Sequence, residues 1–261
     1  MNENKIKKPL LKAIVFELIP QVCMIMACII IYSMQIEPIP NNNINVSFLL
    51  IHSFWVCISI TIGIIIIKTK IFKWDFAGIG IKRIEKNTLK NVFYLFPLFI
   101  IVMLPLFKGI DNTTNTFKVL LFWILHFLVV GIHEEFYNRG IILSLFKDNF
   151  KKAIIISSVI FGIGHITNMV HIIFNKELIF SEFLVSTLIQ MVFAFIIGVV
   201  YAEIVVITKS ILPVIFFHAF WNFTATISNG SDLISWIQTL LLVIFAIIMW
   251  IKIFKKSPNC T

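Results

Sequence analysis

Eight apolar runs dominate the chain, and each is close to the length that a helix needs to cross a lipid bilayer. They occupy about residues 11–34, 46–67, 91–107, 118–145, 153–170, 183–207, 211–228 and 232–254. A transmembrane helix needs roughly 20 mainly apolar residues, and its helical hydrogen bonds satisfy the backbone where water is absent. The pattern therefore predicts an all-α, polytopic membrane bundle of about eight transmembrane helices. The third and seventh runs are the shortest.

The composition excludes an ordinary water-soluble fold. Hydrophobic residues make up 59% of the chain and charged residues 13%, whereas soluble domains contain about 45–50% and about 25%. Residues 1–261 are interpreted as one integral membrane domain. The run that follows Lys12 is too long for a cleavable signal peptide and has no small-residue cleavage site. The cysteines form no CxxC pair, so no disulfide framework is predicted.

The net charge of +9 reflects membrane topology rather than nucleic-acid binding, because the lysines lie at the ends of the apolar runs. With the N-terminus inside, 18 of the 22 lysines and arginines fall in cytoplasmic segments. The outer loops keep Lys108, Lys118 and Lys176. The positive-inside rule therefore predicts that both termini are cytoplasmic. The long connection from Lys68 to Lys90 is either an interfacial stretch on anionic lipid or a basic cytoplasmic loop.

Ionisable residues inside the predicted spans are the most informative polar groups. Each costs about 2.5–3.5 kcal/mol near the bilayer centre on insertion scales, so such groups are usually functional. They are Glu17, His52, His126, His133, Glu134, Glu135, Arg139, His165, Glu203 and His218. Of these, His52, His126 and Glu203 are interpreted as helix-packing groups. Glu17 is interpreted in the same way, since it also lies near a span end from which it can reach the interface. His133 either joins the site or faces a neighbouring helix.

Three short stretches hold most of these groups, at residues 133–140, 161–165 and 218–222. Glu135 and Arg139 are four residues apart, so they share a helix face and can pair. The same spacing relates His218 to Asn222. Adjacent Glu134 and Glu135 point about 100° apart, so one is expected to face the site and the other to be held by Arg139 or another helix. The three stretches lie about 12–18 Å from the cytoplasmic ends of their spans, which places them in one layer.

These residue types in one layer suit a hydrolytic site. Glu134 would take a proton from water, and His165 would orient that water or carry the proton. Asn222 and His218 would donate hydrogen bonds to the oxyanion of a tetrahedral intermediate, and Arg139 would balance negative charge. A zinc site made by Glu134, His165 and His218 is the alternative. The chain has no HExxH sequence, so spacing leaves the choice open.

The order EExxxR at 134–139 followed by Gly140, FxxxH at 161–165 and HxxxN at 218–222 resembles the CPBP family of intramembrane proteases. That family includes the CAAX prenyl endopeptidases of the Rce1 type and bacterial Abi relatives linked to bacteriocin processing and immunity. The resemblance covers about residues 117–228. It implies an all-helical bundle whose site opens toward the cytoplasmic side, with either zinc or a glutamate-dependent mechanism.

The resemblance also implies roles for single residues. Glu134 would activate water, with assistance from His165. The supporting site residues would be Glu135, Arg139, His218 and Asn222, the last two near the oxyanion. Asn138 stands where many members carry Phe, a difference expected to alter packing rather than chemistry.

The sequence thus predicts an intramembrane endopeptidase that cuts a membrane-associated peptide or protein. Its partners would be that substrate and the lipid bilayer. The many Ile, Lys and Asn residues favour an AT-rich bacterial genome and a plasma-membrane location. A bacteriocin precursor, a peptide pheromone or a membrane-protein tail is then a better substrate candidate than a prenylated protein. Two alternatives are a non-catalytic immunity or sensor protein that binds a peptide, and a proton-coupled transporter.

Overall fold

The computed structural model describes residues 8–39, 44–69, 72, 74–84, 95–112, 116–170, 179–230 and 232–255. Within these ranges the regular structure is entirely helical, apart from one isolated bridge between Ile110 and Ser228. In chain order the elements are α1 (Pro9–Ser33), α2 (Val46–Ile67), α4 (Phe96–Met103) with η3 (Leu104–Lys108), α5 (Phe117–Glu135) with η4 (Phe136–Ile142), α6 (Phe150–Gly164) with η5 (His165–Met169), α8 (Phe180–Thr208), α9 (Leu212–Ile227) and α10 (Asp232–Lys255).

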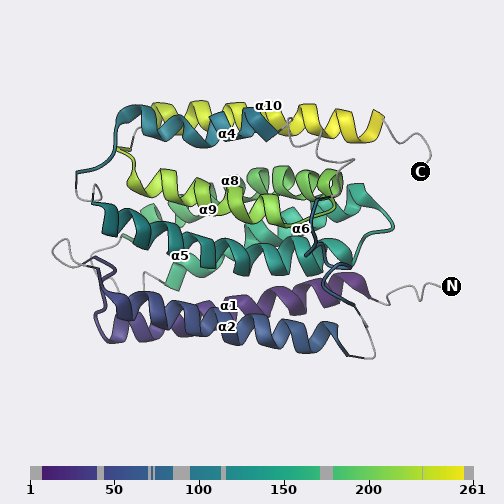
Figure 1. The fold of residues 1–261 in the computed structure, drawn as a ribbon, viewed down its shortest axis with the longest axis horizontal. Helices are drawn as coiled ribbons and strands as arrows, with labels where there is room; N and C mark the ends of the chain where they lie inside the picture. The colour runs from purple at the N-terminus through teal and green to yellow at the C-terminus, as the bar shows by residue number, and fades with distance from the viewer. Residues whose placement is uncertain are drawn as a thin grey trace.

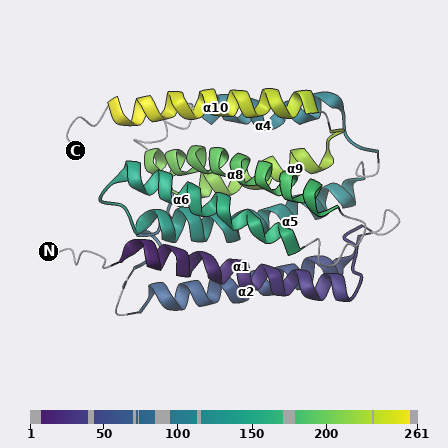
Figure 2. The same ribbon diagram turned by 180° about the vertical axis from the view of Figure 1, so that it is seen from behind.

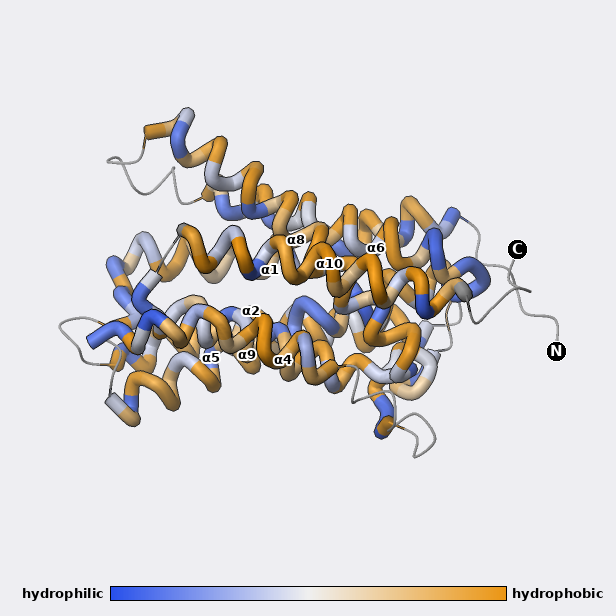
Figure 3. Tube along the Cα trace, turned by 90° about the horizontal axis from the view of Figure 1, so that it is seen from above, coloured by the Kyte–Doolittle hydropathy of each residue, from blue (hydrophilic) through white to orange (hydrophobic). Residues whose placement is uncertain are grey.

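The predicted all-α membrane bundle is confirmed. Six helical stretches of the described chain are long and apolar enough to cross a membrane, and they match six of the eight predicted runs. The third and seventh runs form the two shorter apolar helices, Phe96–Lys108 and Leu212–Ile227. Figure 3 shows hydrophobic residues along the helices, with hydrophilic residues gathered mainly toward the two ends of the bundle and a few between them.

The helices form three layers, which Figures 1 and 2 show from opposite sides. One outer layer is the pair α1 and α2, and the other is the pair α4 and α10. The central layer contains α5, α6, α8 and α9. Because the three polar stretches lie on α5, α6 and α9, this arrangement places them in the middle of the molecule, between the two outer pairs.

Local sequence explains where several helices begin. The side chains of Asn45, Thr116 and Asn149 accept hydrogen bonds from backbone N–H groups two or three residues ahead, and so cap α2, α5 and α6. Proline occupies the first turn of α1, α4 and α9. A proline there loses no helical hydrogen bond, because the first-turn N–H groups have no partner inside the helix.

Successive helices run in opposite directions, so α1 begins and α10 ends at the same end of the bundle (Figure 1). We call this the basic end, because it carries most of the described lysines and arginines. These are Lys8, Lys12, Lys68, Lys82, Arg83, Lys147, Lys151, Lys152, Lys209, Lys252 and Lys255. Among described basic residues only Lys108 and Lys118 lie at the opposite end, and Arg139 lies between the two.

A loop of residues 74–84 packs against the helices at the basic end. Its Ile79 is fully buried. The N–H of Ile211 donates to the Gly80 carbonyl at 2.9 Å, and Ser210 Oγ donates to the Lys82 carbonyl at 2.7 Å. A Cβ on Gly140 would lie 3.3 Å from the Ile79 carbonyl oxygen, which is a close approach. This part of the predicted interfacial or loop connection is therefore packed onto the bundle, while residues 70, 71, 73 and 85–90 lie outside the described residues.

Candidate functional site

Two glycines let the central helices approach closely enough to build a site. A Cβ on Gly131 of α5 would lie 3.0 Å from the carbonyl oxygen of Ile215, on α9. A Cβ on Gly162 of α6 would lie 2.9 Å from the carbonyl oxygen of Met191, on α8. Both distances are shorter than ordinary carbon–oxygen contacts. The absence of side chains at these positions thus brings the α5–α9 and α6–α8 backbones together beside the polar stretches.

The helix of α5 widens into a π-helix at its two glutamates. The π-helical segment η4 begins at Phe136, directly after Glu135, and all seven of its residues are buried. Single π-helical turns inside α-helices are rare and are frequent at functional sites. Here the change falls within the EExxxR stretch itself, between Glu135 and Arg139.

Glu135 is held by two partners inside the bundle. Arg139 Nη1 lies 3.1 Å from Glu135 Oε1, and both side chains are fully buried. His218 Nδ1 lies 2.7 Å from the same oxygen. Because a carboxylate only accepts hydrogen bonds, the imidazole donates from Nδ1. The predicted pairing of Glu135 with Arg139 is present in the structure, and α9 adds a second contact to the same carboxylate.

Arg139 is enclosed by α6 and α8. Its Nη2 donates to the Gly198 carbonyl at 3.2 Å. The guanidinium lies over the ring of Phe161 at 4.2 Å and over that of Tyr201 at 5.5 Å, measured to the ring centroids. Such cation–π contacts are strongest where water is excluded. The arginine therefore fixes Glu135 from a rigid, dry environment.

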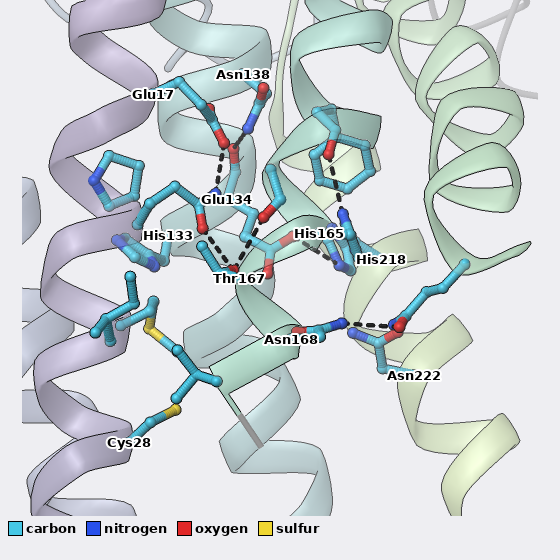
Figure 4. A pocket seen from close by; sticks show the side chains of 18 residues that line it. Glu17, Cys28, His133, Glu134, Asn138, His165, Thr167, Asn168, His218 and Asn222 are labelled. Atoms are coloured by element: carbon cyan, nitrogen blue, oxygen red, sulfur yellow. Dashed lines mark hydrogen bonds and ion pairs between the residues drawn. The ribbon is translucent and has the colours of Figure 1, made fainter. Parts of the chain in front are cut away.

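Glu134 faces a cavity of about 240 Å³. About 31% of its side chain is exposed, whereas the side chain of Glu135 is fully buried. Its Oε2 lies 3.7 Å from His218 Nε2, so the imidazole stands between the two glutamates. The expectation that the adjacent acids point in different directions, with one held by Arg139, is met. Figure 4 shows Glu134 in this cavity together with His165 and His218.

His165 is the first residue of η5 and borders the same cavity. Its Nδ1 lies 2.9 Å from the Phe161 carbonyl oxygen. A carbonyl can only accept, so Nδ1 carries a proton, and in the neutral ring Nε2 is then a hydrogen-bond acceptor. The FxxxH spacing thus sets the tautomer of the histidine through its own helix.

Asn222 lies one turn beyond His218 on α9 and lines the cavity with a partly exposed side chain. Within the described part of the chain its carboxamide makes no hydrogen bond that would occupy it. The six residues predicted from sequence are thereby placed in two groups. Glu134, His165, His218 and Asn222 border the cavity, while Glu135 and Arg139 support them from behind.

Two polar residues of α1, Glu17 and Gln21, line the cavity although the sequence did not assign them to it. Glu17 is 8% exposed and borders the cavity, so its carboxylate lies beside the site residues and not at the membrane interface. Gln21 Nε2 donates to Glu17 Oε1 at 2.6 Å, and Thr167 Oγ1 donates to Gln21 Oε1 at 2.8 Å. The only sequence signal was the four-residue spacing of Glu17 and Gln21 in an otherwise apolar run. Figure 4 shows Glu17 beside Asn138 at one end of the cavity.

Other intramembrane polar groups pack between helices. The ring of His133 borders the cavity, but its Nε2 lies 2.9 Å from Ser59 Oγ on α2, so it faces the neighbouring helix. His52 and His126 stack at the α2–α5 contact with ring centroids 4.7 Å apart. Glu203 is fully buried in α8, away from the residues that line the cavity. These positions agree with the packing interpretation of His52, His126 and Glu203.

The zinc alternative was tested against the donor groups. Among the described residues, no group of three or more His, Cys, Asp or Glu side chains is arranged to hold a metal ion. In this arrangement Glu134, His165 and His218 are therefore not placed as a set of zinc ligands, and no chemical step below uses a metal.

Residues 116–224 match the family described as Rce1-like, type II CAAX prenyl endopeptidase. This is a family of proteases, and the matched segment contains all six candidate site residues. The resemblance inferred from the three spaced stretches is confirmed. No curated protein and no solved structure was found to be similar to the chain.

Proposed function

Because residues 116–224 match the Rce1-like family of type II CAAX prenyl endopeptidases, we propose that this protein is an intramembrane endopeptidase in which Glu134 activates the attacking water. The substrate is a membrane-associated peptide or a membrane-protein segment. The protein works in a bacterial plasma membrane, where bacteriocin processing or self-immunity is the leading biological role.

The observation that carries this proposal is the unequal environment of two adjacent glutamates. Glu134 has the more accessible carboxylate and lies in the cavity. The Glu135 carboxylate is fully buried and bonded to Arg139 and His218. A general base must reach the water that it deprotonates, so Glu134 is suited to that role and Glu135 to positioning.

In the first step, Glu134 takes a proton from a water molecule as the water oxygen attacks the carbonyl carbon of the scissile peptide bond. His165 Nε2 accepts a hydrogen bond from the second O–H group of that water and so orients the water molecule. A tetrahedral intermediate forms with its negative charge on the former carbonyl oxygen. Collapse breaks the C–N bond, and the proton held by Glu134 passes to the leaving amine. The products are a carboxylate and an amine.

The oxyanion needs hydrogen-bond donors in a site that excludes bulk water. The Asn222 carboxamide is available for this, because no described residue occupies it. His218 donates to Glu135 from Nδ1, and the doubly protonated ring donates from Nε2 to the oxyanion. Glu135 then balances the charge of the imidazolium. This arrangement explains why a buried acid, an arginine and a histidine are assembled behind the cavity.

The test is cleavage by purified protein in proteoliposomes, with Glu134→Gln compared against Glu203→Gln. Both changes neutralise a carboxylate inside a helix, but only Glu134 borders the cavity. Loss of a general base reduces the rate by about 10²–10⁴-fold. The Glu203→Gln variant should retain activity. Wild-type activity in a folded Glu134→Gln variant would remove the catalytic assignment and favour a protein that only binds peptides.

A further inference from the structure

Glu17 adds a second carboxylate to the catalytic cavity, and one of its oxygens has no partner. Gln21 Nε2 donates to Oε1 at 2.6 Å, whereas the buried Oε2 accepts no hydrogen bond from the described part of the chain. Glu17 is only 8% exposed, and it borders the cavity. An unsatisfied oxygen is unfavourable in such a place, so this side chain suits a ligand that donates a hydrogen bond.

Asn138 leaves a second acceptor without a partner next to Glu17. Its Nδ2 donates to the backbone carbonyl of Glu134 at 3.2 Å. Since a carbonyl only accepts hydrogen bonds, this contact sets the orientation of the amide. Asn138 is 2% exposed, and no described residue donates to its Oδ1. Figure 4 shows the two side chains together at one end of the cavity, which both of them line.

The charges around the cavity favour a cationic ligand. Glu17 and Glu134 are the acidic side chains of its described lining, which contains no lysine or arginine. The nearby Arg139 is paired with Glu135, and His218 lies between Glu135 and Glu134. Among the described groups, neither of these two cationic or imidazole side chains is paired with Glu17. A positive charge brought in by a ligand would therefore be attracted to this carboxylate.

An ammonium group matches these two acceptors better than other cations do. It is a compact charge with three N–H donors, so it can donate to Glu17 Oε2 and to Asn138 Oδ1 at once. A guanidinium is a planar fork that pairs best with both oxygens of one carboxylate, and Gln21 already occupies Oε1. Magnesium or calcium would need about six oxygen ligands or more.

We propose that Glu17 and Asn138 form a subsite for an ammonium group of the substrate, supplied by a lysine side chain or by an N-terminal amine. The last torsion of a glutamate side chain is soft, so the carboxylate can turn toward the ligand while α1 stays in place. Gln21 is itself held by Thr167 at 2.8 Å. The subsite follows from the acceptors and charges, whereas the identification of its ligand as a substrate group rests on the proposed function.

Binding is measured first, without any need for cleavage, by thermal unfolding of the purified protein in detergent micelles at neutral pH. The probes are n-butylammonium, which matches the end of a lysine side chain, glycinamide, which matches an N-terminal amine, and n-butanol, which has no charge. Glu17→Gln is compared with Glu203→Gln. Glu203 is also buried with unpartnered oxygens, but it does not line the cavity.

At least one of the two ammonium probes should raise the Tm of the wild type, because a ligand that binds only the folded state stabilises it. The probe with the larger shift identifies the source of the ammonium group. Glu203→Gln should keep the shift, and Glu17→Gln should lose it. The subsite is wrong if neither ammonium probe shifts the Tm, if n-butanol shifts it equally, or if Glu17→Gln responds like the wild type.

A cleavage assay then tests whether the ligand is part of the substrate. Internally quenched peptides are supplied in matched sets that differ only in lysine or norleucine at one position, each with a free or an acetylated N-terminus. A hydrogen bond to a charged group should favour the ammonium-bearing member by about 10- to 100-fold in kcat/KM. Glu17→Gln should lose this preference, whereas Glu17→Asp should keep part of it and Glu203→Gln all of it.

Cleavage by the wild type with no preference for an ammonium group, or the same preference in Glu17→Gln, would overturn the assignment of the subsite to the substrate. If the ammonium probes bind as expected but no peptide is cleaved, the endopeptidase assignment fails and the ammonium site stands.

Discussion

His218 on α9 donates from Nδ1 to Glu135 Oε1 on α5 across 2.7 Å, although 83 positions separate the two residues in the chain. The contact places the imidazole with its other nitrogen, Nε2, toward Glu134 and the cavity. Arg139 holds the same glutamate oxygen from the other side at 3.1 Å. Glu135 thus connects the EExxxR stretch to the HxxxN stretch through its contact with His218. This contact fixes the position of the imidazole, and so of its Nε2 atom.

Removing one partner of this buried pair should destabilise the bundle. Glu135→Leu leaves Arg139 buried without its carboxylate, and breaking a buried ion pair in this way costs about 3–5 kcal/mol. The double change Glu135→Gln with Arg139→Gln should recover much of the stability, because neither charge remains, while proteolysis stays lost. Thermal unfolding in detergent micelles measures the stability, and peptide cleavage measures the activity. Equal stability of Glu135→Leu and wild type would contradict the pairing.

Gly164 should be intolerant of a side chain because two side chains of α1 lie against it. A Cβ there would lie 2.5 Å from Glu17 Oε1 and 2.6 Å from Gln21 Nε2, so these side chains would have to move. The next residue is His165, and a displacement of catalytic groups by about 1 Å can cost about 10²-fold in rate. Gly164→Ala should therefore lower kcat with little effect on folding.

Gly230→Ala is the matched control, because no heavy atom lies within 4 Å of the Cβ that it would add. Combining Gly164→Ala with Gln21→Ala should restore part of the rate by making room. If Gly164→Ala is as active as the control, α1 does not position His165.

Sequence alone predicted the membrane helices, their boundaries and the residues that gather at the site. The reason is that a membrane-spanning helix can be recognised from one continuous segment of sequence. Its apolar length and its flanking lysines both lie within that segment. The pairing of Glu135 with Arg139 was also local, at four residues. These predictions needed no knowledge of which helix packs against which.

Sequence could not predict contacts that depend on helix packing. Glu17 was interpreted as a packing group near the end of a span, and only the packing of α1 against α6 shows it buried beside Gly164. The packing of the loop 74–84 was likewise left open between two interpretations. Its fully buried Ile79 has its carbonyl oxygen 3.3 Å from the position of a Cβ on Gly140, a long-range contact that no spacing encodes.

Glu203 should destabilise the folded protein and take no part in catalysis. It is fully buried, and neither carboxylate oxygen has a hydrogen-bond partner among the described residues. An unsatisfied buried polar group costs about 1–3 kcal/mol, so Glu203→Leu should raise the free energy of unfolding by about that amount and leave cleavage unchanged. Gln238→Leu serves as the comparison, since Gln238 is also buried but donates to the Ile101 carbonyl at 2.9 Å. That change should lower stability. Loss of cleavage in Glu203→Leu would assign this acid a functional role.

Chelation should leave peptide cleavage unchanged. In the described part of the chain no three His, Cys, Asp or Glu side chains are arranged around a common metal position. A catalytic zinc needs three protein ligands and an open position for water, so cleavage should persist after dialysis against 1,10-phenanthroline. Elemental analysis of the purified protein should then find less than one zinc per chain. Inactivation by the chelator that added Zn²⁺ reverses would contradict the glutamate-dependent mechanism, and would point to Glu134, His165 and His218 rearranging as ligands.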